Sequence, residues 1–198
     1  MAAFKPAVSG LDQSGGDWPP DHELLAGAAS AGQRPEDVAP YRFGPAVSPH
    51  LAAELAGEPL DPRRLTETAR AAGRGADALI CEGVGGLLVP LTPGYLVRDL
   101  ALDLGLPLVV AARPRLGTIN HTLLTVESAR AAGLSVAGVV MTPWPEAPSR
   151  LEVSNRETVS RLAGMQVSIL APTTPDDLAS AGRALPLDGW LSHNQPDA

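Results

Sequence analysis

Cysteine is nearly absent from this sequence, because Cys81 is the only one among 198 residues. A single cysteine excludes an internal disulfide, and free thiols are typical of reducing compartments, so we expect a cytoplasmic protein. No apolar run approaches the roughly 18 residues that predict a membrane span, and the first residues lack the pattern of a signal peptide. We therefore expect no membrane association, and we interpret Cys81 as a small buried core residue.

Lysine and aromatic residues are also scarce. Lys5 is the only lysine beside 14 arginines, and aromatic residues make up 4% of the chain. With so few rings, the core must be built from Ala, Leu and Val. The net charge of −7 argues against nucleic-acid binding, which usually requires a basic surface. Because a lysine ammonium is a compact point charge, a lysine that persists beside so many arginines is a candidate for chemistry of its own.

The sequence alternates between strand and helix patterns. Apolar runs predict strands at 2–8, 78–81, 106–112, 136–141 and 167–170. Helical spacing and cap residues predict helices at 22–29, 51–57, 61–73, 96–105, 118–132 and 150–163. This alternation predicts an α/β fold, a parallel sheet with helices on both faces. No repeat or linker divides the chain, so we expect a single domain over 1–191 and a disordered tail over 192–198.

The most informative stretch is Leu79–Pro90, where an apolar run ends at Glu82 and the glycines Gly83, Gly85 and Gly86 follow. Glycines let backbone N–H groups approach a ligand closely. Ligands of parallel sheets bind at the carboxyl ends of the strands, where Glu82 is expected. A carboxylate there suits Mg²⁺ held together with nucleotide phosphates. The alternative is an ordinary glycine-rich turn with Glu82 in solvent.

Two predicted helix starts add candidate polar groups. Asp21 stands where an N-cap is expected, and a cap beside a phosphate site can also hold a metal-bound water. Thr118 is the expected N-cap of the helix over 118–132, whose free N–H groups form an anion site. Asn120 and His121 could orient a carboxylate or phosphate there. The simpler alternatives are a plain cap for Asp21 and solvent-facing side chains for Asn120 and His121.

Four segments, taken in order, resemble the dethiobiotin synthetases, the ATP-dependent cyclo-ligases of the biotin pathway. They are Phe-Lys-Pro-Ala-Val-Ser-Gly at 4–10, Ser-Pro-His at 48–50, Glu-Gly-Val-Gly-Gly at 82–86 and Leu-Gly-Thr-Ile-Asn-His-Thr-Leu-Leu-Thr at 116–125. The resemblance covers almost the whole chain, and Trp144-Pro145 looks like the actinobacterial branch. It implies a P-loop NTPase-like fold of the dethiobiotin synthetase type.

The resemblance also implies a reaction. Such enzymes close 7,8-diaminopelargonate and CO₂ into a cyclic urea with ATP and Mg²⁺, through a carbamate and a carbamic-phosphoric anhydride. The protein's task is then positioning and charge stabilisation. The implied partners are these small molecules and a second copy of the chain, with the substrate site near a homodimer interface.

The residues that match the family's ATP and metal site lie in the first half of the chain. Lys5 matches the catalytic lysine, which would hold carbamate and γ-phosphate oxygens, and Ser9 matches a substrate-contacting hydroxyl. The resemblance implies that Mg²⁺ is held by Asp21 and Glu82. The segment beside the nucleotide is implied to include Asp21, Glu82, Gly83, Val84 and Gly85.

The matching residues of the second half concern the substrate tail and the base. Gly117, Thr118 and Asn120 match the family's cradle for the tail carboxylate, reached from the neighbouring subunit. The purine pocket is implied to be lined by Thr142, Pro143 and Pro172. Many relatives carry an adenine-reading Asn where Thr142 stands, so another nucleoside triphosphate could serve.

One departure from the family is large. The phosphate loop Gly-x-x-x-x-Gly-Lys-[Ser/Thr] is not found, and the chain starts where the family's second strand starts. About 30 residues of strand, loop and helix would precede it in the family pattern. Three interpretations stay open: the natural protein is longer, the chain is a decayed copy, or it serves another role. We expect no catalysis from a chain that truly begins at Met1.

Two other functions are compatible with parts of this pattern. One is a non-catalytic homologue that dimerises and binds an acidic small molecule. The other is a cobyrinate-type P-loop amide synthase. The Lys-Pro-x-x-Ser-Gly and Leu-Gly-x-Ile-Asn-His segments count against the second alternative, and so does the absence of a glutaminase domain from this sequence.

Overall fold

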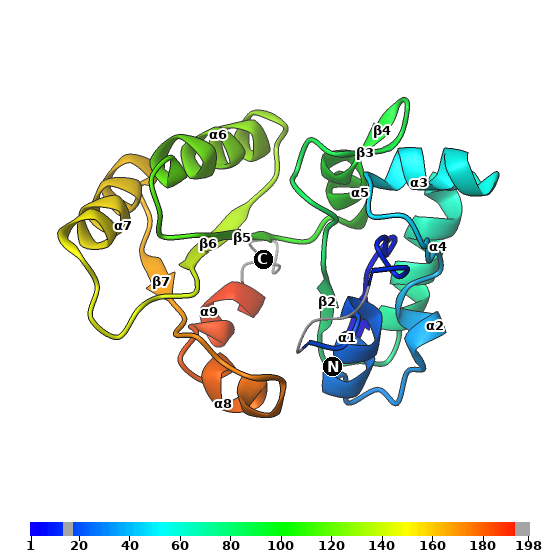
Figure 1. The fold of residues 1–198 in the computed structure, drawn as a ribbon, viewed down its shortest axis with the longest axis horizontal. Helices are drawn as coiled ribbons and strands as arrows, with labels where there is room; N and C mark the ends of the chain where they lie inside the picture. Colours follow the sequence, from blue (N-terminus) through cyan, green and yellow to red (C-terminus); the bar gives the residue numbers. More distant parts are fainter. Residues whose placement is uncertain (14–17, 193–198) are drawn as a thin grey trace. The chain divides into compact units, whose positions relative to one another are not determined.

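The computed structural model describes residues 1–13 and 18–192. Contacts divide the chain into two compact units, Met1–Leu104 and Gly105–Ala198, which are described separately below. In each unit parallel strands are flanked by helices (Figure 1), which confirms the predicted α/β class. The single domain over 1–191 stays a prediction. Apart from Ser192, which ends a helix, the predicted tail lies outside the described residues.

In the first unit, β1 (Ala2–Phe4) pairs in parallel with β2 (Leu79–Cys81), and β3 (Pro90–Thr92) forms an antiparallel pair with β4 (Tyr95–Leu96). The helices in the described part of this unit are α1 (Asp21–Ala28), α2 (Pro35–Val38), α3 (Pro49–Ala56), α4 (Pro62–Gly73) and α5 (Val97–Leu104). β1 is shorter than the predicted strand over 2–8. One reason is Pro6, which has no N–H to donate to a sheet.

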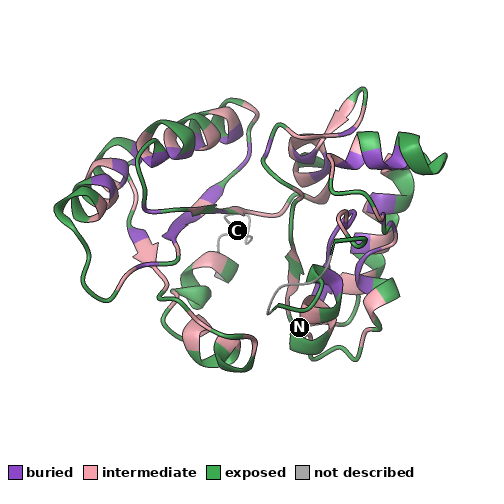
Figure 2. Ribbon diagram, in the orientation of Figure 1, coloured by how far each residue is buried: buried purple, intermediate pink, exposed green. Residues whose placement is uncertain are grey.

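The core of the first unit lies between β1 and the inner faces of α3 and α4. Phe4 and Leu65 are fully buried in one apolar cluster with Leu91. α4 contributes Leu65 because its sequence is amphipathic and because Asp61 caps its start, with a carboxylate oxygen that accepts from the Arg63 N–H at 2.9 Å. Figure 2 shows the buried residues of α3 among exposed ones, as expected for a helix covering a core.

The outer edge of β1 is closed by a side chain rather than by another strand. The Ala3 N–H donates to Gln33 Oε1 at 2.7 Å, and Gln33 Nε2 donates to the Ala3 carbonyl oxygen at 2.9 Å. Beyond Ala3, the Lys5 N–H donates to the Val38 carbonyl oxygen at 3.0 Å. Both backbone groups of Ala3 that point away from β2 are therefore satisfied.

The second unit is built on the parallel sheet β5 (Leu108–Ala112), β6 (Val136–Met141) and β7 (Val167–Ile169), in the order β5-β6-β7. α6 (Thr118–Ala131) and α7 (Arg150–Ala163) lie on one side of it, and the C-terminal segment lies on the other (Figure 1). That segment contains a 3₁₀ turn (Pro175–Asp177), α8 (Leu178–Gly182) and α9 (Leu187–Ser192). Trp190 of α9 packs on β6 at Gly138, where a Cβ atom would lie 2.5 Å from its indole nitrogen.

Several local predictions differ from the structure. No strand was predicted between the glycines after Glu82 and the helix over 96–105, yet the hairpin of β3 and β4 precedes α5 there. The N-cap of α6 is Gly117 with φ of 91°, so the prediction of Thr118 as the cap is wrong. Gly117 takes the cap because this left-handed conformation is open to glycine. Among residues 1–13 and 18–192, no helix is both long and apolar enough to cross a membrane.

Candidate functional site

The register of β1 and β2 brings Lys5 beside Glu82. Phe4 is paired with Cys81, and the Glu82 N–H donates to the Phe4 carbonyl oxygen at 2.8 Å. Lys5 directly follows β1 and Glu82 directly follows β2, so both side chains lie at the carboxyl ends of neighbouring parallel strands. This is the place in a parallel sheet where ligands bind.

The Lys5 ammonium lies between two carboxylates. Its Nζ is 2.7 Å from Glu82 Oε1 and 3.0 Å from Asp21 Oδ2. A third acceptor, the carbonyl oxygen of Gly83, lies at 3.5 Å. The Lys5 side chain is 5% exposed, whereas those of Asp21 and Glu82 are 56% and 47% exposed. The cation is therefore buried behind two carboxylates that face solvent.

Asp21 reaches this cluster from the first residue of α1. The prediction that it caps α1 is wrong, because Pro20 occupies the cap position and no side chain caps the helix. The Asp21 carboxylate pairs with Lys5 instead. An ion pair with a buried ammonium is screened less by solvent than a contact between fully exposed charges.

Two of the glycines after β2 lie where a larger residue would be crowded or strained. A Cβ atom on Gly83 would lie 3.0 Å from the Val97 side chain, and Gly85 has φ of 73°. Val84 between them is half-buried and packs against the core of the first unit. Among the described residues of this turn, Glu82 and the Gly83 carbonyl oxygen accept hydrogen bonds from Lys5. The nucleotide contacts of Gly83, Val84 and Gly85 remain predictions.

Ser9 is the remaining predicted site residue of the first unit, and it is half-buried. The residues on either side of it are fixed, because the Val8 N–H donates to Tyr41 and the Gly10 N–H donates to Pro45, both at 3.0 Å. These bonds hold the segment that follows Lys5 against the 41–45 loop. The contact of Ser9 with the substrate remains a prediction.

The predicted substrate-tail residues lie at the start of α6 in the second unit. Gly117 and Asn120 are exposed, whereas Thr118 is buried with its hydroxyl 3.3 Å from that of Thr122. A hollow of about 300 Å³ at this helix start is lined by residues that include Arg113, Arg115, Thr118 and His121. The two arginines were not among the predicted site residues. Their place between a predicted strand and a predicted helix start could have indicated an anion site.

The predicted base-binding residues follow β6 and β7. The Thr142 N–H donates to the Ala112 carbonyl oxygen at 2.9 Å, and the Trp144 N–H donates to that of Leu170 at 2.8 Å. These bonds bring the loop with Thr142 and Pro143 next to the segment that leads to Pro172. The candidate residues thus form one group in the first unit and two groups at strand ends in the second.

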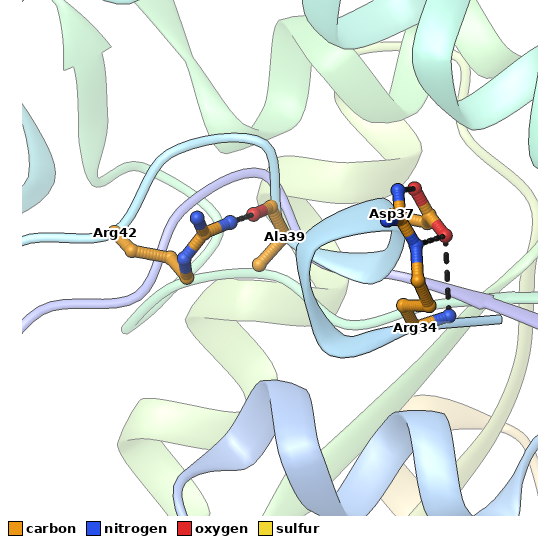
Figure 3. A network of polar contacts seen from close by, with 4 residues as sticks. All are labelled: Arg34, Asp37, Ala39 and Arg42. Atoms are coloured by element: carbon orange, nitrogen blue, oxygen red, sulfur yellow. Dashed lines mark hydrogen bonds and ion pairs between the residues drawn. The ribbon is translucent and has the colours of Figure 1, made fainter.

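A hollow of about 870 Å³ in the first unit contains none of the predicted site residues. Its walls include Arg42, which donates to the Ala39 carbonyl oxygen at 2.7 Å, and Arg64, which stacks over the Tyr41 ring at 4.7 Å. Figure 3 shows Arg42 and, in the same view, Arg34, which donates two side-chain hydrogen bonds to Asp37. These hydrogen bonds lower the pKa of the Asp37 carboxyl. We interpret these arginines as structural because protein groups already hold them.

No cluster of three or more His, Cys, Asp or Glu side chains suited to a metal is present among the described residues. The pair Asp21 and Glu82 nevertheless fits Mg²⁺ by its chemistry. Each carboxylate places an oxygen within 3.0 Å of one cation, the Lys5 ammonium, and both are open to solvent. Mg²⁺ is usually held by one or two carboxylates together with waters and phosphates.

Cys81 lies next to Glu82 and is half-buried against the core of the first unit, and burial raises the pKa of its thiol to about 12. Because the thiolate is the nucleophile, we expect iodoacetamide to modify native Cys81 at pH 8 at least about a hundredfold more slowly than Cys81 in urea-unfolded chain. The thiol keeps its proton to higher pH in the native state than in the unfolded chain. Because burial penalises only the thiolate, this group leaves the stability unchanged below about pH 9 and lowers it as the pH rises from about 9 towards 12. Mass spectrometry at timed intervals measures the rate of iodoacetamide modification in the native and in the unfolded chain. Equal rates would contradict a buried thiol.

Comparison with known proteins is consistent with this geometry. A family model described as an AAA domain matches residues 1–175. A protein of Anaeromyxobacter dehalogenans (strain 2CP-1 / ATCC BAA-258) is 41% identical over 183 residues, which are 92% of this chain and 80% of that protein. A Bacillus subtilis (strain 168) protein is 33% identical over 172 residues, 87% of this chain and 74% of its own length. Both are named ATP-dependent dethiobiotin synthetase BioD.

Proposed function

Since the chain belongs to the family of ATP-dependent dethiobiotin synthetases, we propose that it closes 7,8-diaminopelargonate and CO₂ into dethiobiotin. One amine adds to CO₂ and loses a proton, which gives a carbamate. A carbamate oxygen then takes the γ-phosphoryl group of ATP and releases ADP. The second amine attacks the carbamoyl carbon, loses a proton and expels phosphate, which leaves the cyclic urea.

The observation that carries this proposal is the buried Lys5 ammonium at the carboxyl ends of β1 and β2, 2.7 Å from Glu82. Phosphoryl transfer places negative charge on phosphate and carbamate oxygens, so a fixed cation at this edge stabilises it. Lys5 is the proposed catalytic residue. Ser9 is proposed to contact the substrate, and the backbone of Gly83, Val84 and Gly85 is proposed to lie beside the nucleotide.

Mg²⁺ is the proposed metal, held by Asp21 and Glu82. When bound, it supplies positive charge to the phosphate oxygens. Hard carboxylate oxygens suit it, and the half-exposed side chains of both residues leave room for waters and phosphates. Asp21 and Glu82 thereby hold the ion and orient it, whereas Lys5 contacts the transferred group.

The second unit is proposed to bind the tail carboxylate of the substrate and the base of the nucleotide. Gly117, Thr118 and Asn120 are proposed to bind the tail carboxylate of a substrate held by the neighbouring copy in a homodimer. The support is the hollow at this helix start, which Arg113 and Arg115 also line. Thr142, Pro143 and Pro172 are proposed to contact the base, and Thr142 leaves the choice of nucleoside triphosphate open. The proposed compartment is the reducing cytoplasm.

The proposal is tested with protein that includes any residues the gene encodes before Met1. We expect ¹³C from labelled bicarbonate to enter a product of dethiobiotin mass, with one ADP formed for each cyclic urea. 8-Aminononanoate is the matched control, because it has one amine and cannot close the ring. Absence of ¹³C incorporation would refute the ligase function. Absence of Mg·ATP binding in calorimetry as well would favour the non-catalytic alternative, in which the chain only binds an acidic small molecule.

A further inference from the structure

The Lys5 ammonium is held by protein groups in the structure. It donates hydrogen bonds to Glu82 Oε1 at 2.7 Å and to the Gly83 carbonyl oxygen at 3.5 Å. It also forms an ion pair with Asp21, whose Oδ2 lies 3.0 Å from Nζ. The contact with Gly83 is the longest and therefore the weakest. In this arrangement Lys5 serves as the counter-ion of its own neighbours.

This arrangement conflicts with the proposed roles of the same three side chains. Asp21 and Glu82 are proposed to hold a divalent cation, yet one oxygen of each already lies within 3.0 Å of the Lys5 nitrogen. A divalent cation bound to these two oxygens would lie close to the ammonium, and the two positive charges would repel each other. Metal binding at these oxygens therefore favours departure of the ammonium from the carboxylates.

The net charge of the cluster favours a fixed order. Lys5, Asp21 and Glu82 together carry one negative charge, which repels a phosphate or a carbamate. Binding of a divalent cation changes the total to one positive charge, which attracts such an anion. The carboxylates of Glu82 and Asp21 are 47% and 56% exposed, so the cation can reach them from solvent.

We propose that Lys5 is a resident cation of the Asp21–Glu82 pair, and that a divalent cation displaces its ammonium and frees it for the anionic ligand. The metal then acts as a switch that makes Lys5 available, in addition to supplying its own charge. This inference rests on the metal site in the proposed function. It adds that metal binding precedes or accompanies engagement of the anion by Lys5.

The first test follows Lys5 itself. Protein labelled with ¹³Cε/¹⁵Nζ-lysine gives a signal for the Lys5 side chain, which is identified by its loss in Lys5→Met. Addition of Mg²⁺ alone should shift this signal in a saturable manner. The same addition to Glu82→Gln should give less than a third of that shift. A Lys5 signal that stays in place while calorimetry records Mg²⁺ binding would overturn the proposal.

The second test measures affinity for Mn²⁺ by calorimetry. Lys5→Met removes the resident cation, so the Kd should fall at least tenfold. Arg98→Met is the matched control, because it removes a cation paired with another carboxylate of the same unit, Asp99 at 3.4 Å, and should change the Kd less than twofold. An unchanged or raised Kd in Lys5→Met, with circular dichroism like that of the wild type, would overturn the proposal.

The outcomes separate this inference from the function on which it rests. If neither Mg²⁺ nor Mn²⁺ binds, the metal assignment and the displacement both fail. If the metal binds and the Lys5 signal does not respond, the displacement alone fails. If the signal responds but no cyclic urea forms in the ¹³C assay, the displacement stands and the proposed ligase function fails.

Discussion

Replacing Lys5 with methionine is expected to lower the kcat of ring closure by about a hundredfold to a thousandfold, the loss typical when one group that stabilises transition-state charge is removed. Methionine matches the length of the lysine stem and removes only the charge and its donors. The native fold should persist, because Asp21 and Glu82 are half-exposed and water can solvate both carboxylates once their partner is gone. The measurement is ¹³C incorporation into the cyclic product at saturating ATP and diamine.

Lys5→Arg is the matched control for this prediction. It keeps the positive charge but replaces a compact ammonium with a planar fork, so we expect a kcat between those of the wild type and Lys5→Met. Far-ultraviolet circular dichroism of both variants should overlay on the wild type. If Lys5→Met kept a third or more of the wild-type kcat while folded, Lys5 would not be the catalytic residue.

Replacing Phe4 with alanine is expected to reduce the free energy of unfolding by about 3–5 kcal/mol. Phe4 is fully buried in the apolar cluster of the first unit, so its replacement by alanine leaves a cavity there. Since domains are stable by only about 5–15 kcal/mol, this is a large fraction of the total. The urea midpoint of unfolding should fall accordingly.

Leu55→Ala is the surface control for this variant. Leu55 is 63% exposed on α3, and its replacement should change the free energy by less than about 0.5 kcal/mol. Phe4 also precedes Lys5 and pairs with Cys81, so its loss should loosen the Lys5–Glu82 contact and reduce activity below the unfolding temperature. Equal urea midpoints for Phe4→Ala and Leu55→Ala would contradict the assigned core.

The elements that the sequence predicted best have strong local signals. β6 at Val136–Met141 is a continuous apolar run, as expected for a strand buried on both faces. α7 at Arg150–Ala163 begins at Ser149 with Glu152 in a capping box and ends at Gly164 with φ of 68°. Both sets of bounds match the predicted ranges, because these signals lie within the elements or next to them.

The hairpin of β3 and β4 was missed because its strands are short. They have three and two residues, too few for a periodic pattern. Contacts between distant parts of the chain limited the prediction of the site. Glu82 was expected at a strand end from its own surroundings, and it lies there. That Lys5 would lie between Asp21 and Glu82 could not be read from positions so far apart in the chain, because strand register and the approach of α1 bring them together.

The paired hydrogen bonds between Gln33 and Ala3 bear on how copies of this protein meet in concentrated solution. An open strand edge is a template on which a strand from another molecule can grow, and it is a common origin of aggregates. At Ala3 the amide of Gln33 takes both backbone groups that such a strand would need. A single side chain thereby removes a site of edge-to-edge aggregation beside the charged cluster, and it leaves the carboxyl end of β1 open for small molecules.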